Sequence, residues 1–226
     1  MIRSRQPSSF GLVLVFALGA LLAAGQPLQA ADRSVTILEG VEEPPPDAAP
    51  PPAGAAPLTA LKTENPAGVV LNILPNGNLH LGAQIALTVS TQRPGFIVIV
   101  DINAEGRWTQ IYPNMLSLSR TAGDVATANL IRPGSPVTIP NLTSPLARFV
   151  FKADPPRGNG AIVAILSDRP VQIIDLPETP ASPTNLQAAV DALAQSVIGL
   201  KIASSKDARS FSPGVWSFAA APYTIE

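Results

Sequence analysis

Cysteine is absent from the 226-residue chain, which contains one histidine, two tryptophans and two tyrosines. Without cysteine, neither a disulfide scaffold nor a cysteine-ligated metal site is possible. The single histidine excludes a multi-histidine metal site and leaves His80 as the one candidate imidazole base. Aromatic residues make up only 5% of the chain, so a sugar-binding platform has little support.

Charged residues are also scarce. They make up 14% of the chain, whereas about 25% is usual for soluble domains. The 15 cations and 16 acids nearly cancel and give a formal charge of −1. Nucleic-acid binders normally show a basic patch, and the scattered cations here predict no nucleic-acid partner. Proline is abundant instead, with 25 residues, and 46% of residues are hydrophobic.

The first thirty residues have the order of a secretory signal peptide. Arg3 and Arg5 supply a basic start, residues 10–24 form an uncharged apolar run, and a short polar stretch leads to Ala30. The two arginines are not adjacent, which favours a Sec-type over a twin-arginine signal. At about 1.5 Å per residue the run spans roughly 22 Å, less than a bilayer core of about 30 Å.

From this order we expect cleavage near Ala30, a periplasmic or secreted mature chain, and no transmembrane span after cleavage. Retention of residues 10–24 as an uncleaved anchor is the alternative.

A short N-terminal segment and a linker follow. Residues 31–43 contain one apolar patch, residues 35–38, flanked by acids. Half of residues 44–57 are proline, which fixes φ and lacks an amide donor, so extended polyproline II geometry is expected there. We interpret residues 44–66 as a Pro/Ala-rich linker and residues 67–226 as a β-rich domain. A docking ligand for a proline-binding groove is the alternative for the linker.

The body predicts a mainly β fold. Residues 84–90 alternate between apolar and polar side chains, as a half-buried strand does. Residues 96–100 are continuously apolar, as a central strand covered on both faces would be. Turn signals at about ten-residue spacings, such as residues 101–106 and 157–160, predict an antiparallel β-sandwich or open barrel. The other strand candidates are residues 69–74, 107–112, 125–131, 136–139, 148–152, 161–166 and 215–225.

One C-terminal amphipathic helix is predicted at about residues 185–198. Thr184 or Asn185 would cap its start, apolar residues recur every three or four positions, and Gly199 is a natural stop. We expect its apolar face to cover one side of the sheet, and a partner-binding helix is the alternative. Residues 201–214 are polar and are expected to be loose.

Residues 101–106 begin like a calcium-binding loop, D-x-[DN]-x-[DN]-G. Such a loop needs a bidentate glutamate at its twelfth position, where this chain has Tyr112. Glu105 is longer than the expected Asp or Asn, and the flanking segments are predicted strands. We therefore interpret the segment as a hairpin turn and expect no metal.

No catalytic residues and no cofactor are expected. The chain has no G-x-S-x-G nucleophile elbow and no phosphate-binding G-x-x-x-x-G-K-[ST] loop. His80 lies at the mouth of a strand, which favours a surface histidine, and the acids mostly fall at predicted turns, where carboxylates are usually solvated. A hydrolase of envelope polymer, built on paired carboxylates or on His80, is kept as an alternative.

A series of short motifs carries a resemblance to a known family. They are Leu81-Gly82-Ala83-Gln84-Ile85, Pro94-Gly95-Phe96, an apolar strand ending in Asp101, Glu105-Gly106, and Ile111-Tyr112-Pro113-Asn114. In this order they resemble the bacterial domain-of-unknown-function 4384 family over about residues 79–178, with Phe96 for the usual Tyr and Glu105 for the usual Asp. The resemblance implies a β-rich accessory module of an exported protein and no known catalytic residues.

Candidate binding residues lie in two turns, and they are Asp101, Asn103, Glu105, Gly106, Tyr112, Pro113 and Asn114. Proline ends a strand and asparagine turns the chain, so we interpret residues 112–114 as a strand terminator, and a ligand-contact loop is the alternative. We hypothesise an exported, non-catalytic accessory or binding module of the bacterial cell envelope, whose partner is another exported protein or an envelope component. A structural protein that self-assembles through an exposed strand edge is the alternative.

Overall fold

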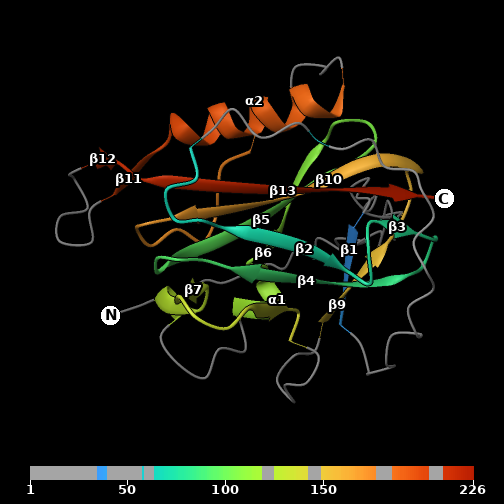
Figure 1. The fold of residues 1–226 in the computed structure, drawn as a ribbon, viewed down its shortest axis with the longest axis horizontal. Helices are drawn as coiled ribbons and strands as arrows, with labels where there is room; N and C mark the ends of the chain where they lie inside the picture. Colours follow the sequence, from blue (N-terminus) through green and yellow to red (C-terminus); the bar gives the residue numbers. More distant parts are fainter. Residues whose placement is uncertain are drawn as a thin grey trace, which may run out of the picture.

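The computed structural model describes residues 35–39, 58, 64–118, 125–141, 149–176, 185–203 and 211–226. The predicted signal peptide and the proline-rich residues 44–57 lie outside this part of the chain. Two β-sheets pack face to face, and a helix covers the outer face of the second sheet (Figure 1). The predicted mainly β fold with one helix near the C-terminus is confirmed. In the described part of the chain, no helix has the length and apolar character needed to cross a membrane.

The first sheet has five strands in the order β1-β9-β4-β2, with β8 also beside β4. All of its pairs are antiparallel. The alternation predicted for residues 84–90 is confirmed, because Ile85, Leu87 and Val89 are buried in the core. The apolar patch at residues 35–38 lies in β1, which pairs with β9 at the edge of this sheet. The strands are β1 (Val35–Glu39), β2 (Val70–Leu74), β4 (Gln84–Ser90), β8 (Val137–Ile139) and β9 (Phe149–Ala153).

The second sheet has six strands in the order β3-β13-β10-β5-β6, with β7 beside β5. Its pairs are antiparallel except for β13 with β3, which is parallel. β5 lies between β10 and β6 and is buried on both faces, as its continuous apolar run predicts. The strands are β3 (Asn78–Leu79), β5 (Gly95–Ile102), β6 (Trp108–Tyr112), β7 (Leu130–Ile131), β10 (Gly158–Ser167) and β13 (Trp216–Ile225).

The second sheet separates two apolar cores. Side chains such as Ile99 and Ile162 point toward the first sheet, whereas Val100 and Val163 point toward helix α2 (Leu186–Ile198). The side chain of Asn185 caps α2 by accepting a hydrogen bond from the backbone N–H of Ala188. The predicted cap and apolar face are therefore confirmed, and the buried residues of α2 are Ala189, Val190, Leu193, Ala194 and Val197.

The strand predicted at residues 125–131 is wrong for most of its length. Val125–Thr127 form a 3-10 turn, and only β7 pairs with β5. Between them the buried Asn129 donates from Nδ2 to the carbonyls of Ile97 and Val171 at 2.9 and 2.7 Å. The Asn129 side chain thus holds the segment together with one backbone bond, which the N–H of Ile97 donates to the carbonyl of Asn129 at 2.9 Å.

Two expected loops also contain strand. The turn predicted at residues 157–160 belongs mostly to β10, because the ladder with β13 extends to the pair Gly158–Ile225. Within residues 201–214, which the sequence predicts to be loose, β11 (Lys201–Ala203) pairs with β12 (Phe211–Pro213). These ladders depend on partners distant in sequence or on a short hairpin, and composition alone does not reveal either.

The outer edge of β6 is covered by the segment that follows β10. The Gln110 side chain donates from Nε2 to the carbonyls of Pro113 and Gln172 at 2.9 and 2.6 Å. Its Oε1 accepts from the backbone N–H of Ile174 at 3.0 Å. The Gln110 side-chain amide therefore makes three hydrogen bonds to the backbone at this edge, where no further described strand pairs with β6.

Gln110→Ala is expected to lower the free energy of unfolding by about 1–3 kcal/mol, because part-buried backbone groups lose their partner. Denaturant unfolding measures the loss. Gln195→Ala, on the exposed side of α2, is the matched control and should change stability by less than about 0.5 kcal/mol. Equal losses in the two variants would contradict the bracing role of Gln110.

Candidate functional site

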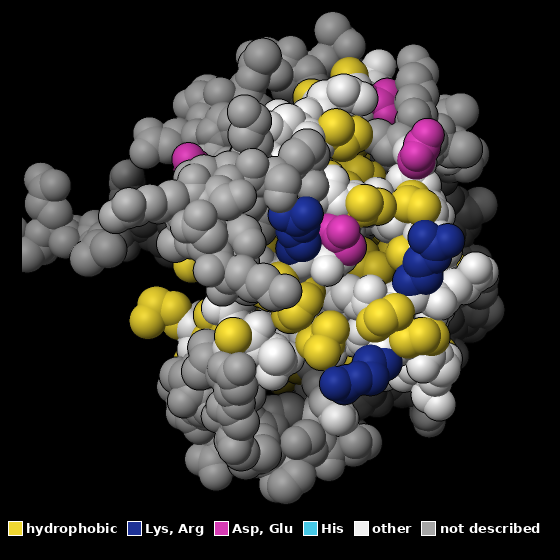
Figure 2. Space-filling model, turned by 90° about the vertical axis from the view of Figure 1, so that its left-hand side faces the viewer, with side chains coloured by type: hydrophobic (Ala, Val, Ile, Leu, Met, Phe, Trp, Pro, Cys, Tyr) yellow, Lys and Arg dark blue, Asp and Glu magenta, His cyan; other side chains and the backbone are white. Residues whose placement is uncertain are grey.

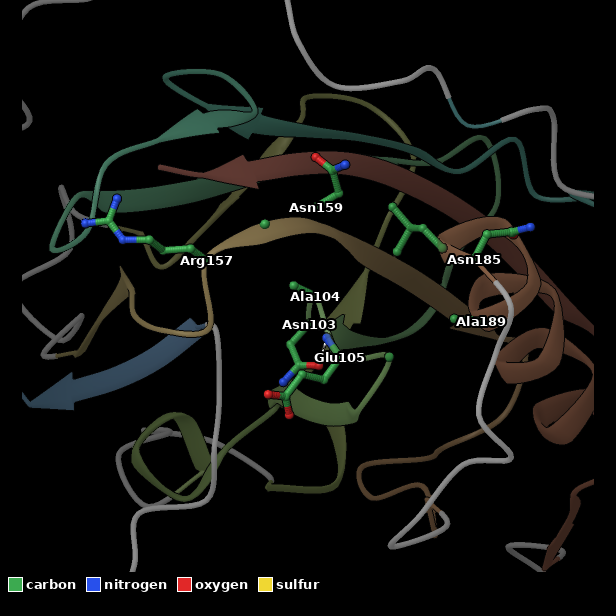
Figure 3. Close-up of a pocket in the computed structure, with 10 residues that line it drawn as sticks. Asn103, Ala104, Glu105, Arg157, Asn159, Asn185 and Ala189 are labelled. Carbon is green, nitrogen blue, oxygen red and sulfur yellow. Dashed lines mark hydrogen bonds between the residues drawn. The ribbon is translucent and has the colours of Figure 1, made fainter.

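One end of the sandwich carries a cavity of about 450 Å³. Three segments distant in sequence form it: the turn between β5 and β6, the start of β10 and the start of α2 (Figure 3). Its volume lies within the range of about 300–1,000 Å³ typical of ligand sites. The lining residues are Asn103, Ala104, Glu105, Gly106, Arg157, Gly158, Asn159, Asn185, Leu186 and Ala189.

Asn103 shapes the turn that forms one wall. It is only 2% exposed, and its Oδ1 accepts from the backbone N–H groups of Glu105 and Arg107 at 3.0 and 2.9 Å. Gly106 adopts a φ of 79°, a region that favours glycine. The hairpin turn expected in this stretch is present, and it begins at Asn103. Asn103 thereby holds Ala104 and Glu105 at the rim.

The expectation that Asp101 is a turn residue with a solvated carboxylate is wrong. Asp101 lies within β5, is 1% exposed, and does not line the cavity. Its Oδ1 accepts a 2.7 Å hydrogen bond from the hydroxyl of Tyr223 on β13. Tyr223 reaches it across β10 at Gly160, where a Cβ would collide with the tyrosine ring. A polar partner from a distant strand therefore allows the carboxyl to be buried.

Residues 112–114, the other candidate group, are not among those that line the cavity. Tyr112 ends β6, and Pro113 is buried. Asn114 caps the short helix α1 (Met115–Leu118), because its Oδ1 accepts from the backbone N–H of Ser117 at 2.8 Å. These contacts match the interpretation of residues 112–114 as a strand terminator. The structure thus brings Asn103, Glu105 and Gly106 together at the cavity and leaves Asp101 and residues 112–114 outside it.

Burial raises the pKa of the Tyr112 phenol above its ordinary value of 10.0. The unfolded chain therefore loses this proton first as pH rises. The contribution of Tyr112 to stability is complete below about pH 10 and is lost as pH rises from there through the raised folded pKa. We expect the free energy of unfolding to fall more steeply between about pH 9 and about pH 11 in the wild type than in Tyr112→Phe. Denaturant midpoints across this range measure the difference, and parallel profiles would contradict it.

The charges at the rim are few and largely exposed. Glu105 forms a 3.2 Å ion pair with Arg107, and both side chains are about half exposed. Arg157 is exposed, and Figure 3 shows its guanidinium extending away from the other labelled side chains. The Oδ1 of Asn159 accepts from the hydroxyl of Thr224 at 2.8 Å, which orients its amide.

The lining suits recognition by hydrogen bonds. Asn103, Asn159 and Asn185 contribute side-chain amides, which do not exchange protons near neutral pH, and the Oδ1 of each already accepts a hydrogen bond within the fold. Glu105 and Arg157 add one group of each charge. Among the described residues, no group of three or more His, Asp or Glu side chains is placed to hold a metal ion. His80 is exposed, as expected, and is not a lining residue.

The sequence pattern predicts only half of this cavity. The turn at residues 103–106 stands out by its resemblance to a metal loop, whereas Arg157 and Asn159 lie in a stretch that the glycines predict as a simple turn. Asn185 is recognisable as a helix cap, but nothing in the pattern places it beside that turn. Asn159 lies between two glycines at the start of a strand, and this pattern could have indicated a place where a ligand or another chain segment approaches closely.

Residues 78–170 match the family model described as Domain of unknown function (DUF4384). The resemblance predicted from the sequence motifs is therefore confirmed. No curated protein and no solved structure matches the chain. The matched residues include two of the three segments that line the cavity, and α2 lies beyond them.

Proposed function

We propose that the protein is an exported, non-catalytic binding module of the bacterial cell envelope, and that the cavity receives a polar segment of its partner. The partner is another exported protein or an envelope component. The order of basic, apolar and small residues in residues 1–30 supports export. The amide-rich cavity is the observation on which the binding role depends.

Each wall of the cavity is held in place by the fold. Asn103 braces the turn with two hydrogen bonds, β10 lies in the middle of the second sheet, and Asn185 caps α2 at its first turn. Ligand sites are usually preformed and concave, with a few oriented polar groups on a largely apolar lining; this cavity shares the concave form but has a mainly polar lining. A neutral polar partner fits this lining better than one carrying a strong charge, because amides predominate among its polar groups and Glu105 is already paired with Arg107.

Ala104→Trp tests the site by filling the cavity from an exposed rim position. Capture of envelope components by the full-length chain is expected to fall at least about tenfold, the ratio that a loss of about 1.4 kcal/mol produces. Ala126→Trp is the matched control, because Ala126 is exposed and lies outside the cavity. It should retain capture, and both variants should keep the unfolding midpoint of the wild type.

Two outcomes would contradict the proposal. Equal capture by Ala104→Trp and Ala126→Trp would show that the partner does not bind in the cavity. Failure of the wild-type chain to capture any envelope component would remove the binding role itself.

Export has a separate test. Cell fractionation and N-terminal sequencing should find the mature chain in the periplasm or the medium, beginning close to Ala31. An intact N-terminus in the cytoplasm would contradict export and leave the cavity experiment unaffected.

A further inference from the structure

The end of the sandwich opposite the cavity carries a second distinctive surface. β5 begins and β10 ends there, and their turns are adjacent because Gly95 pairs with Ile131 and Phe96 pairs with Ser167. β13 begins at the same end, since Trp216 pairs with Ser167. Three turns and the start of β13 therefore meet on one face of the molecule.

Three arginines lie on these turns. Arg93 and Arg132 are exposed, and Arg169 is half-buried. The nearest acid in sequence is Asp168, whose Oδ1 accepts a 2.9 Å hydrogen bond from the backbone N–H of Val215. This bond holds the start of β13 but leaves the exposed carboxylate charged, so the three arginines and Asp168 together carry a net charge of 3 − 1 = +2. We call this surface the basic end, defined by Arg93, Arg132, Arg169, Asp168 and Val215.

Exposed apolar side chains lie on the same turns and at the start of β13. Val215 is 54% exposed, and Pro94 and Pro133, next to Arg93 and Arg132, are also exposed. Figure 2 shows this face of the molecule, with dark blue cations among yellow hydrophobic side chains and a magenta acidic side chain beside one of the cations. The basic end therefore combines positive charge with apolar loop tips.

We propose that the basic end docks on an anionic lipid bilayer. Arginine binds phosphate oxygens bidentately, and each cation near an anionic membrane contributes about 1 kcal/mol of attraction, or about fivefold in affinity. Exposed apolar tips beside the cations enter the boundary between headgroups and acyl chains. An acidic protein would satisfy the arginines but would leave Val215 and the prolines without an apolar layer to enter.

Docking through the basic end would leave the cavity at the other end of the same strands facing away from the bilayer. Membrane docking goes beyond the proposed function. It depends on that function only through export, which determines which membrane the protein can reach. Vesicle binding is measured in the test tube, so its failure is distinct from a failure of export or of the cavity.

The test is sedimentation of the full-length chain with vesicles of phosphatidylcholine alone or of equal parts phosphatidylcholine and phosphatidylglycerol. We expect stronger binding to the anionic vesicles, weakened by added salt because salt screens surface charge. Arg93→Gln with Arg132→Gln should lower the binding constant about 25-fold, at about fivefold for each arginine. Every variant carries the same residues 1–30, so any contribution of their apolar run cancels in the comparison.

The matched control replaces Arg107 and Lys152, two cations away from the basic end, by glutamine. It removes the same charge and should leave binding to anionic vesicles within about twofold of the wild type. Val215→Ser should weaken binding without changing net charge, and Ala104→Trp should not alter it. Equal binding to both kinds of vesicle, or equal loss in the two double variants, would overturn the proposal. Unfolding midpoints verify that each variant is folded. The salt dependence of wild-type binding tests the proposal even if a variant fails to fold.

Discussion

Replacing Gly160 by alanine is expected to destabilise the domain by about 3 kcal/mol or more, which is at the upper end of the losses that overpacking of a core produces. An added Cβ would collide with the ring and hydroxyl of Tyr223 and would lie 2.7 Å from the carbonyl oxygen of Ile102. The backbone carbonyl belongs to the central strand β5 and cannot turn aside. Tyr223 cannot move without losing its hydrogen bond to Asp101.

Denaturant unfolding measures this effect, and Gly199→Ala is the matched control. Gly199 ends α2 with a φ of −71°, and an added Cβ there meets no atom closer than 3.5 Å. The control should change stability by less than about 1 kcal/mol. Combining Gly160→Ala with Tyr223→Leu should cost less than the sum of the two single changes, because the colliding ring is gone. A Gly160→Ala protein as stable as the wild type would contradict the packing described for β5, β10 and β13.

Tyr223→Phe is expected to cost about 1.5–3 kcal/mol, because it removes a hydrogen bond from a carboxyl group in the core. The ring and its packing stay in place, so the loss reports the hydroxyl alone. In a double-mutant cycle with Asp101→Ala, which removes the accepting oxygen, the coupling energy should be about 1–2 kcal/mol. Additive losses would show that the 2.7 Å contact between Tyr223 and Asp101 contributes no stability.

Tyr112→Phe near neutral pH is the control for Tyr223→Phe. Its hydroxyl donates to the carbonyl of Ala128 over 3.4 Å, close to the limit of a hydrogen bond. The change should therefore cost less than about 1 kcal/mol below pH 10. A loss as large as that of Tyr223→Phe would contradict the different roles assigned to the two tyrosines.

Local patterns predict the regular elements of this fold well. The alternation of Ile85, Leu87 and Val89 defines β4, since one face of that strand meets the core and the other does not. The apolar run of β5 marks a strand buried on both faces. Asn185 and the three-to-four spacing that follows define α2. In each case the physical cause lies within the segment itself.

Residues whose environment is set by distant strands are predicted poorly. Asp101 follows an apolar run and resembles a solvated turn acid until Tyr223, 122 residues away, supplies a hydrogen bond. Gly158 and Gly160 resemble turn residues, yet they lie in β10, where Gly160 makes room for the Tyr223 ring. The cavity is affected in the same way, because Asn159 and Asn185 meet the turn at residues 103–106 only after the sheet and helix have packed.

The account depends most on the claim that the partner enters the cavity between the β5–β6 turn, β10 and α2. Hydrogen exchange of the full-length chain, alone and with a captured envelope component, tests it segment by segment. The expected result is added protection at residues 103–107, 158–160 and 186–189, with little change in β2 and β4. Protection confined to other segments, or no change at these three, would contradict the claim.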